Sequence, residues 1–340
     1  MTRLKVACAG TGYFSQFHYD GWSRLPVDLV GCCSLDEDAL SEVAKTHQIS
    51  ATFSDFEAML EETKPDLVDI ITPPPTHKTF VRAAIARNIP VICQKPFCTS
   101  LEEARDLAAE ITAQGATVIV HENFRFQPWH RELKALIDRG AVGELYQVSF
   151  RLRPGDGQGP EAYLARQPYF QKMPRFLIHE TAIHLIDVYR FLLGEVSEVT
   201  ADLRQLNPVI SGEDAGIIIF DFKNGRRGLF DGNRLADHPA ENRRLTMGEM
   251  LIEGSDGALS LNGDGEIHTR PHGQNDWRPH TYDWQNQGFA GDSVHRLQAH
   301  VLDHLTTGAT VQNTAQDYLT NLEIEEAVYR SSAEGRRISL

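Results

Sequence analysis

Short apolar runs alternate with amphipathic stretches over about the first 120 residues of the chain. The apolar runs are rich in Val, Ile and Cys, and most are too short for helices: Leu4–Ala9, Leu29–Cys33, Leu67–Thr72, Val91–Cys93 and Thr117–Val120. We expect them to be buried strands of a parallel sheet. The amphipathic stretches predict helices, at about residues 15–24, 37–47, 54–62, 76–87 and 100–113. This alternation predicts a doubly wound α/β domain over residues 1–122.

The pattern changes after about residue 121. Arg153–Pro174 is polar and rich in Gly and Pro, which is typical of a loop or lid. From about 196 to 284, strand-like runs are separated by turn pairs such as Asn224-Gly225, which predict a large, mostly antiparallel sheet. The other expected elements are helices at Pro128–Arg139, Phe176–Leu193, 292–306 and 314–333, and a strand at Leu145–Leu152. Together they predict an α+β domain with an open sheet over residues 123–340, whose last helices we expect to pack back on the first domain.

Length and charge exclude several classes of protein. A chain of 340 residues suits two cores rather than one. Its formal net charge of -14 repels phosphate backbones, so we expect no nucleic-acid partner. We see no signal peptide and no stretch near the roughly 18 apolar residues that span a bilayer, so we expect a cytoplasmic protein without a membrane partner. The five cysteines fit no zinc template, and we expect reduced thiols.

A glycine-rich turn follows the first expected strand. Gly10 and Gly12 occupy the first two positions of the pattern Gly-x-Gly-x-x-Gly, and Ser15 replaces the third. The first glycine allows a tight turn, and the second lets a pyrophosphate approach the backbone at a helix N-terminus. A plain strand-to-helix turn is the alternative, but the place of the motif in a run of β-α units predicts a dinucleotide site of the Rossmann type.

The end of the second strand bears on the choice of cofactor. An acidic residue that binds the ribose of NAD is expected there, but the chain has Ser34, with Asp36 two residues later. A small polar residue is compatible with NADP, although NADP also needs a cation for its 2′-phosphate, and Leu35 stands where an arginine would be useful. We therefore expect NAD rather than NADP, with Asp36 or Ser34 at the ribose.

Two other sites carry candidate catalytic groups. Lys95 follows the fifth strand, where it can hydrogen-bond a substrate hydroxyl and lower the pKa of that hydroxyl; a solvated strand-end charge is the alternative. In the apolar helix Phe176–Leu193, Glu180, His184 and Asp187 are spaced to share one face. Buried ionisable groups are costly unless they are paired or line a wet cavity, so the stripe predicts either a general base, His184, or a structural histidine with ion pairs.

Taken in order, these motifs resemble the Gfo/Idh/MocA family of oxidoreductases. The resemblance covers essentially the whole chain. Its remaining pieces are the run from Thr72-Pro73 to His77, Gln94-Lys95-Pro96 in place of a family Glu-Lys-Pro, Asn123 to Pro128, and Glu180 to Arg190 in place of Asp-x-x-x-His-x-x-Asp. Gln94 removes an acid beside Lys95, and Glu180 is one methylene longer than the usual Asp.

The resemblance implies a Rossmann domain followed by an α+β domain, with the nicotinamide between them. It implies that Lys95 binds and polarises a substrate hydroxyl, that His184 takes the hydroxyl proton, and that Glu180 supports His184. The implied cofactor contacts are Gly10, Gly12, Tyr13, Phe14, Ser34, Asp36, Thr72, Pro73, His77, Gln94, Lys95 and Asn123. The implied substrate contacts are Lys95, Asn123, Arg125, Tyr163, Arg166, Glu180 and His184.

The resemblance also indicates a substrate class. The runs Gln94–Phe97 and Asn123–Trp129 resemble aldose dehydrogenases that act on pentoses, branched ones such as D-apiose included, which would give a lactone. A glycosidase of the same family that uses NAD without net turnover is one alternative. A non-catalytic NAD-binding sensor is another, although neither Lys95 nor His184 is missing.

Two further expectations concern metals and assembly. His295, His300 and His304 lie on one expected helix, but they lack the pattern His-Glu-x-x-His, so we expect surface or interface histidines and no metal site. An open sheet with one apolar face has to be covered, and Gly216–Phe222 and Met250–Glu253 would supply that face. We therefore expect a homodimer or homotetramer.

Overall fold

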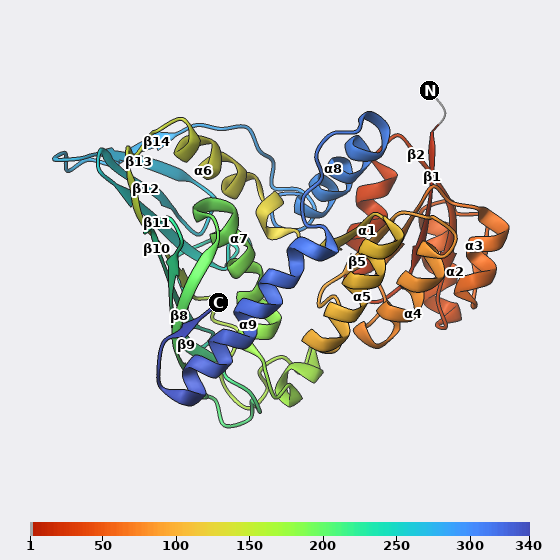
Figure 1. Ribbon diagram of the computed structural model, residues 1–340, viewed down its shortest axis with the longest axis horizontal. Helices are drawn as coiled ribbons and strands as arrows, with labels where there is room; N and C mark the ends of the chain where they lie inside the picture. Colours follow the sequence, from red (N-terminus) through yellow and green to blue (C-terminus); the bar gives the residue numbers. More distant parts are fainter. Residues whose placement is uncertain (1–2) are drawn as a thin grey trace. The chain divides into compact units, whose positions relative to one another are not determined.

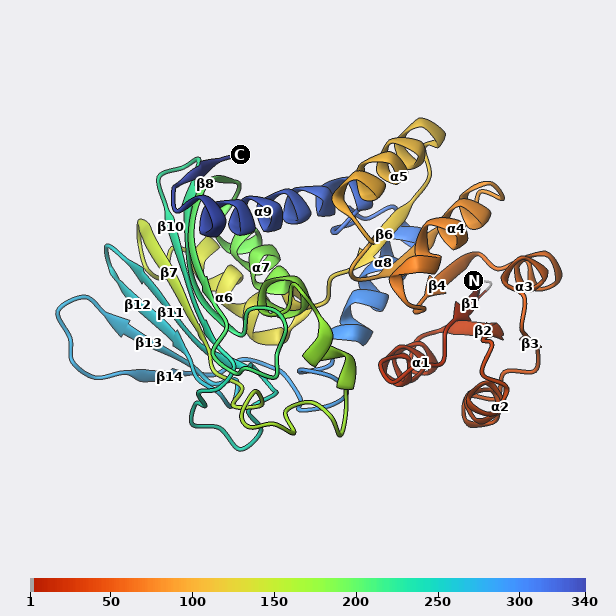
Figure 2. The ribbon, with the colours of Figure 1, turned by 90° about the horizontal axis from the view of Figure 1, so that it is seen from below.

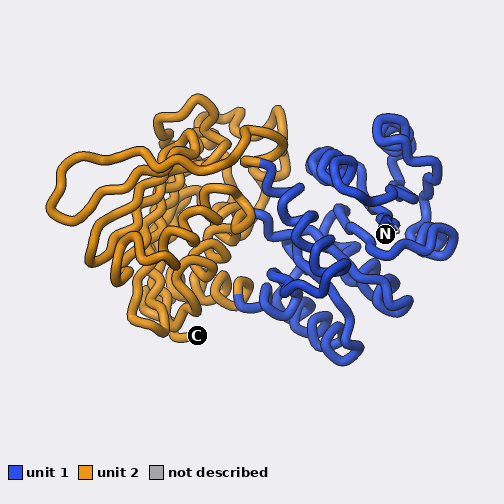
Figure 3. The backbone as a smooth tube through the Cα atoms, turned by 90° about the horizontal axis from the view of Figure 1, so that it is seen from above, with its two compact units in different colours: residues 1–123, 292–320 blue, residues 124–291, 321–340 orange. Residues whose placement is uncertain are grey.

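The structure, a computed structural model, describes residues 3–340 and contains two compact units (Figure 3). Unit 1 runs to Asn123 and also includes Asp292–Thr320. Unit 2 consists of Phe124–Gly291 and Asn321–Leu340. The chain therefore returns to unit 1 after most of unit 2 has been built, and the boundary between the units falls inside the last helix, Ala315–Glu334.

Unit 1 is built on a parallel sheet whose strands are ordered β3-β2-β1-β4-β5-β6. The strands are β1 (Leu4–Ala9), β2 (Val27–Cys33), β3 (Thr52–Phe53), β4 (Leu67–Ile70), β5 (Val91–Gln94) and β6 (Val118–His121). This order confirms the predicted doubly wound Rossmann sheet. Only β3 was not predicted, because two residues are too few to produce a pattern. The order reverses between β1 and β4, and in such sheets ligands bind outside the carboxyl ends of the strands at this point.

Three of the helices described in unit 1 begin where a short polar side chain accepts a backbone hydrogen bond. The helices of this unit are α1 (Ser15–Ser23), α2 (Glu37–Thr46), α3 (Phe56–Thr63), α4 (Pro74–Ile85), α5 (Leu101–Gln114) and α8 (Ser293–Thr307), followed by the first turns of α9 (Ala315–Glu334). Asp36, Asp55 and Ser100 cap α2, α3 and α5. Helix α8 lies against α1 at Gly21, where a Cβ would meet the Gln298 side chain at 2.1 Å and would displace it.

Unit 2 is built on a nine-stranded, mostly antiparallel sheet ordered β14-β13-β12-β11-β7-β10-β9-β8-β15 (Figure 1). The strands are β7 (Leu145–Leu152), β8 (Val196–Arg204), β9 (Ala215–Phe222), β10 (Arg227–Asn233), β11 (Gly248–Gly254), β12 (Gly257–Leu261), β13 (Ile267–Pro271), β14 (Arg278–His280) and β15 (Ile338–Ser339). Among the described strands of this sheet, only the central pair β7 and β10 is parallel. The predicted second fold, α+β with a large open sheet, is confirmed.

Helices cover one face of this sheet. Figures 1 and 2 show α6 (Pro128–Asp138), α7 (Ile183–Leu193) and the C-terminal part of α9 on the same side. In the part of the chain that the structure describes, no helix of unit 2 covers the other face. Ile217 in β9 is 49% exposed, which fits its place on that uncovered side. None of the helices in residues 3–340 combines the length and the apolar character needed to cross a membrane.

The segment before α7 departs from the prediction. We expected one continuous helix from Phe176 to Leu193, but Leu177–Ala182 forms a π-helix and only Ile183–Leu193 is α-helical. Glu213 supports the unusual turn, because its carboxylate accepts hydrogen bonds from the backbone N–H groups of Phe176 and Ile178, each at 3.1 Å. The assumption of continuous α-helical geometry from Glu180 to His184 is therefore wrong, because i→i+5 hydrogen bonding changes the angle between successive residues. That the two side chains share one face stays a prediction.

Candidate active site

The glycine-rich turn of unit 1 has room for a dinucleotide phosphate. Gly10 follows β1 with φ +116°, and a Cβ there would lie 2.8 Å from the carbonyl carbon of Ile71, so this position requires glycine. A Cβ at Gly12 would meet nothing within 4 Å, which leaves open space over the backbone at the start of α1. Ser15 closes the turn by donating from Oγ to the Gly12 carbonyl at 2.7 Å. The residues present therefore fit a bound NAD pyrophosphate.

The two candidate ribose residues have different local roles. The Ser34 hydroxyl lies 2.7 Å from that of Thr11, between the two glycines, so Ser34 stands beside the glycine-rich turn. The Asp36 carboxylate accepts a hydrogen bond from the Ala39 backbone N–H at 3.0 Å and caps α2. Leu35, between them, is 88% exposed and offers no positive charge for a 2′-phosphate. This pattern fits NAD better than NADP.

His77 joins the segments that follow β4 and β5. Its ring is completely buried, with Nε2 2.7 Å from the carbonyl oxygen of Thr72 and Nδ1 3.1 Å from that of Pro96. Burial lowers the pKa of His77, partly offset by these backbone hydrogen bonds. Pro73, next to Thr72, occupies the N-cap position of α4. The predicted cofactor residues Thr72, Pro73 and His77 are therefore brought together at one end of the sheet.

Lys95 stands directly after β5, and the preceding side chain fixes its backbone. The Lys95 N–H donates to Oε1 of Gln94 at 2.7 Å. The amide nitrogen of Gln94, which is 8% exposed, lies 3.0 Å from Nε2 of His18. The substitution of Gln for the family acid therefore does not break local hydrogen bonding.

Three other predicted cofactor residues lie in unit 1. Asn123 is 2% exposed and donates from its side chain to the hydroxyl of Ser293 at 2.8 Å. Tyr13 is 53% exposed at the start of α1. The Phe14 ring contacts the ring of His18, with centroids 5.7 Å apart. Asn123 is thus built into the interior of unit 1, whereas Tyr13 is open to a ligand.

In unit 2, the imidazole of His184 is stacked on an aromatic ring. The ring centroids of His184 and Phe124 are 4.1 Å apart and the planes differ by 8°. Glu180 lies on the π-helical turn, one turn before His184. Partial desolvation and, after it, the negative charge of Glu180 raise the pKa of Tyr169. Tyr169, which is 54% exposed, is therefore a further polar group near Glu180.

A buried ion pair joins the residue after Phe124 to the helix that carries His184. Arg125 donates from Nε and Nη2 to the two carboxylate oxygens of Asp187, at 2.7 and 2.5 Å. Asn321 adds a hydrogen bond to Asp187 Oδ1 at 2.9 Å and accepts one from Arg190 at 2.8 Å. Asp187 thus ties the Phe124–Phe126 turn to α7. Arg125, predicted to contact the substrate, has its guanidinium engaged in this pair.

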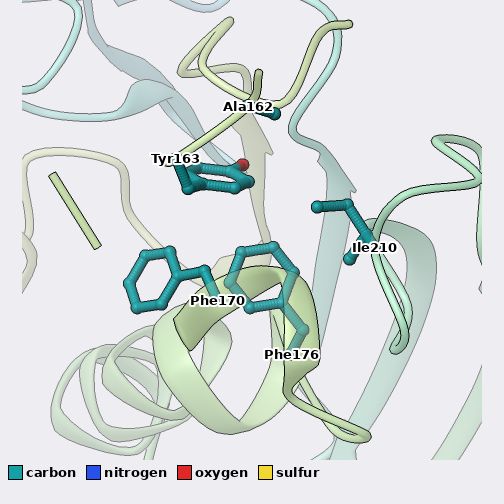
Figure 4. Packing of buried hydrophobic residues seen from close by; sticks show 5 residues of the cluster. All are labelled: Ala162, Tyr163, Phe170, Phe176 and Ile210. Atoms are coloured by element: carbon teal, nitrogen blue, oxygen red, sulfur yellow. The ribbon is translucent and has the colours of Figure 1, made fainter. Parts of the chain in front are cut away.

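Tyr163 and Arg166 lie in the predicted loop and both approach the carboxylate of Asp156. The Tyr163 hydroxyl donates to Asp156 at 3.0 Å and accepts from Nε of Arg234 at 2.8 Å. Arg166 approaches the same Asp156 carboxylate at 3.5 Å. Figure 4 shows the packing that surrounds Tyr163, formed by the rings of Phe170 and Phe176 and by Ala162 and Ile210. Burial raises the pKa of Tyr163, and a substrate role for this residue stays a prediction.

Arg234 connects this loop to the π-helix. It is 2% exposed and lies 4.7 Å from the ring centroid of Phe176. Its Nη2 binds Asp156 at 2.9 Å and its Nη1 donates to the hydroxyl of Thr181 at 2.7 Å. Because Thr181 follows Glu180, the loop and the turn that carries Glu180 are held as one body.

The residues that the structure describes contain no group of three His, Cys, Asp or Glu side chains placed to bind a metal ion. His295 and His304 face the backbone carbonyls of Gly21 and Ala309, at 3.0 and 2.6 Å, and His300 accepts a hydrogen bond from the Gln312 N–H at 3.0 Å. These three histidines therefore fix separate parts of the backbone. The five cysteines are free, buried thiols.

Sequence reasoning missed several of these residues. Phe124 was part of a quoted motif but received no role, because stacking depends on tertiary contacts. Asp69 of β4, whose Oδ2 lies 2.8 Å from Nδ1 of His18, offered a usable signal, since a carboxylate inside an apolar strand needs a buried partner. Its partner, His18, gave no such signal on the mixed sequence of α1. Arg234 lies 71 residues from Tyr163 in sequence, and no local pattern connects them.

Comparison with known proteins matches both units. A family model described as the oxidoreductase family with an NAD-binding Rossmann fold, GFO_IDH_MocA, matches residues 4–122. A model of the GFO/IDH/MocA C-terminal domain matches residues 130–260. Two curated relatives are D-apiose dehydrogenases. The one from Rhizobium rhizogenes is 30% identical over 100% of this chain and 98% of its own length, and the one from Paraburkholderia graminis is 31% identical over 99% and 90%.

Solved structures share the fold of the whole chain. An oxidoreductase from Agrobacterium radiobacter, in complex with NAD+, L-tartaric acid and magnesium, superposes with a TM-score of 0.88 at 29% identity, covering 99% of this chain and 98% of that one. A levoglucosan dehydrogenase in complex with NADH and levoglucosan superposes with a TM-score of 0.82 at 20% identity, covering 99% of both chains.

Proposed function

Because this chain belongs to the Gfo/Idh/MocA family of oxidoreductases, we propose that it oxidises an aldose, a pentose such as D-apiose, to the corresponding lactone. The chain is an NAD-binding oxidoreductase of the sugar and polyol class that acts on CH–OH groups, as the sequence predicted. The choice of sugar and the lactone product are the proposal. The observation that carries it is the identity of 30% and 31% to two D-apiose dehydrogenases over nearly the whole chain.

Bound NAD would supply the hydride acceptor for this reaction. The turn at Gly10 and Gly12 would hold the pyrophosphate through backbone N–H groups at the start of α1. Ser34 or Asp36 would hydrogen-bond the ribose. The exposed Leu35 between them supports NAD over NADP, because the 2′-phosphate of NADP requires a cation.

Lys95 would bind the hydroxyl that is oxidised. An ammonium group close to a hydroxyl favours its deprotonated form by charge and by hydrogen bonding. The hydrogen bond between the Lys95 N–H and Gln94 would fix the backbone from which this side chain extends. Gln94 also leaves the ammonium without an acidic neighbour at position 94, so its charge can act on the substrate.

His184 would take the hydroxyl proton as general base. A base acts efficiently when its orientation is fixed in advance, and stacking on Phe124 restricts the imidazole plane. Glu180 would support His184. The loop residues Tyr163, Tyr169 and Arg166 would contribute to sugar binding, because aromatic rings and guanidinium groups suit a carbohydrate.

A substrate panel tests the proposal. NADH formation would be followed by absorbance with pentoses, hexoses and inositols, D-apiose included, each with NAD and with NADP. We expect turnover with a pentose and NAD. Deuterium at C1 of that sugar should appear in the NADH, since lactone formation removes hydride from C1. Turnover without deuterium transfer would indicate a ketone product, and NADH binding without turnover on any sugar would favour the glycosidase or the sensor.

We also propose a homodimer or homotetramer. The uncovered face of the unit 2 sheet carries Tyr146, which is 53% exposed, and Ile217, which is 49% exposed. Burying this face against a second copy would remove their apolar surface from water. Light scattering tests this proposal, and a monomer would refute it. A cytoplasmic location stays a prediction.

A further inference from the structure

We propose that His18 and Asp69 are positioning residues for Lys95, acting through Gln94 in a buried hydrogen-bonded chain that fixes a single tautomer of His18. The inference rests on the proposed role of Lys95 in unit 1. It extends that role to two residues of α1 and β4 that do not touch the reacting atoms.

The hydrogen-bonded chain begins at a buried carboxylate. Asp69 is completely buried in β4, and its Oδ2 accepts hydrogen bonds from Nδ1 of His18 at 2.8 Å and from Nε1 of Trp22 at 2.7 Å. Its Oδ1 has no hydrogen-bond partner among the described residues. A carboxylate in such a place is costly, and an apolar residue would serve packing alone better. This cost points to a role for the chain beyond packing.

The donors and acceptors along the chain can be assigned in only one way. The Lys95 backbone N–H is a donor, so the side-chain atom 2.7 Å away must be the oxygen of Gln94. The amide nitrogen of Gln94 then faces Nε2 of His18 at 3.0 Å and donates to it. Nε2 must therefore accept, and the ring proton lies on Nδ1, where Asp69 accepts it. Both ends of the chain agree on this tautomer.

Packing holds His18 in this orientation. Its ring is completely buried and lies against the ring of His121, with centroids 4.1 Å apart. Gln298 of α8 donates to the backbone carbonyl of His18 at 3.0 Å. The close approach of α8 at Gly21 makes this contact possible. A side chain fixed on every side transmits its hydrogen-bonding preference to Gln94 rather than rotating away from it.

The first experiment measures the tautomer in the full-length protein without substrate. In 15N-detected NMR of histidine-labelled protein, we expect His18 to carry its proton on Nδ1 and a bare Nε2. Gln94→Glu replaces the amide donor by an acceptor, so both ring nitrogens should then carry protons. Hydrogen exchange at the Lys95 amide should become faster in His18→Leu. A proton on Nε2 of His18 in the wild type, or unchanged exchange at the Lys95 amide in His18→Leu, would overturn the proposed hydrogen-bonded chain.

The second experiment measures positioning. A glutamine at position 18 can donate towards Asp69 and accept from Gln94, whereas leucine can do neither. We expect kcat to fall about tenfold in His18→Leu and to recover in His18→Gln, with NADH affinity unchanged in both. In a Gln94→Ala background, His18→Leu should have no further effect on kcat. Equal kcat values for the leucine and glutamine variants, or additive effects, would overturn the positioning role.

A control variant separates this role from general destabilisation. His238 of unit 2 is also buried, at 3% exposed, and its Nδ1 donates to the carbonyl oxygen of Arg153 at 2.7 Å. His238→Leu should change kcat by the same factor in the wild-type and Gln94→Ala backgrounds. If no sugar is turned over by the wild type, the proposed function fails while the NMR and exchange results still decide whether the chain exists.

Discussion

The imidazole of His184 and the ring of Phe124 lie parallel, 4.1 Å apart. The two residues come from different elements, α7 and the turn Phe124–Phe126, and the buried pair of Arg125 with Asp187 joins the same two elements. Two consecutive residues, Phe124 and Arg125, therefore contact α7, the first by stacking on the proposed general base and the second by an ion pair with Asp187. Each of these contacts can be removed separately.

Phe124→Leu removes the stacked ring and keeps an apolar side chain. We expect kcat to fall about tenfold, because the imidazole then samples more orientations, while NADH affinity changes by less than about twofold. Steady-state kinetics and NADH titration measure the two effects. Phe126→Leu is the matched control, since Phe126 lies under the Arg131 guanidinium, 4.2 Å from it, and should leave kcat close to that of the wild type. Equal losses in the two variants would contradict the role of the stack.

Asp187→Asn breaks the pair with Arg125 and leaves a buried guanidinium without its full countercharge. We expect the free energy of unfolding to fall by about 3 kcal/mol, measured by urea denaturation. The control is Asp202→Asn, which removes the partner of Arg204 in a pair whose side chains are 61% and 67% exposed. It should not shift the midpoint of urea denaturation measurably. A small effect at Asp187 would mean that Asn321 and solvent compensate the lost charge.

The two glycines of the turn should respond differently to alanine. Gly10→Ala places a Cβ 2.8 Å from the backbone of Ile71 at a positive φ, so we expect a marked loss of thermal stability. Gly12→Ala meets no protein atom within 4 Å, so the fold should persist while NADH affinity falls at least about tenfold. Calorimetry and fluorescence titration separate the effects. Unchanged NADH affinity in Gly12→Ala would place the pyrophosphate elsewhere.

His130 should make the protein sensitive to acid. Burial lowers its pKa from 6.5 to about 4, opposed by a hydrogen bond with the Phe124 carbonyl. The neutral form is therefore favoured in the folded state. Its contribution to stability is complete above about pH 6.5 and is lost as the pH falls towards 4, by about 3 kcal/mol in total.

His130→Asn tests this account, because it keeps a donor for the Phe124 carbonyl and cannot titrate. The difference in unfolding free energy between wild type and variant should shrink as the pH falls from about 7 to about 4. Urea denaturation across this range measures it. A constant difference would show that His130 is already accommodated as a cation.

The sequence predicted the fold well because the elements of unit 1 repeat a local pattern. Most of the buried strands are short and apolar and are followed by an amphipathic helix, and signals such as the Ser100 cap of α5 act within one turn. The π-helix Leu177–Ala182 was missed because it depends on Glu213, a residue distant in sequence that binds its first N–H groups. The spacing of apolar residues along the sequence indicates a helix but does not distinguish i→i+4 from i→i+5 hydrogen bonding.

The candidate site was predictable only in part. Lys95 and the two glycines follow strands, so their positions come from the topology. The topology did not predict the partners of these residues, because tertiary packing brings Phe124, Arg234 and His18 to the residues that the sequence had singled out. Arg125 shows the limit most clearly: the family resemblance implied a substrate contact but gave no sign of the bidentate bond to Asp187 that the structure contains.

The most direct test of the central claim is the turnover of His184→Ala on the sugar that the panel identifies, measured together with NADH affinity. The account predicts that kcat falls at least about a hundredfold while NADH still binds, because only the proton acceptor is lost. Unchanged turnover in His184→Ala would contradict the assignment of His184 as the base.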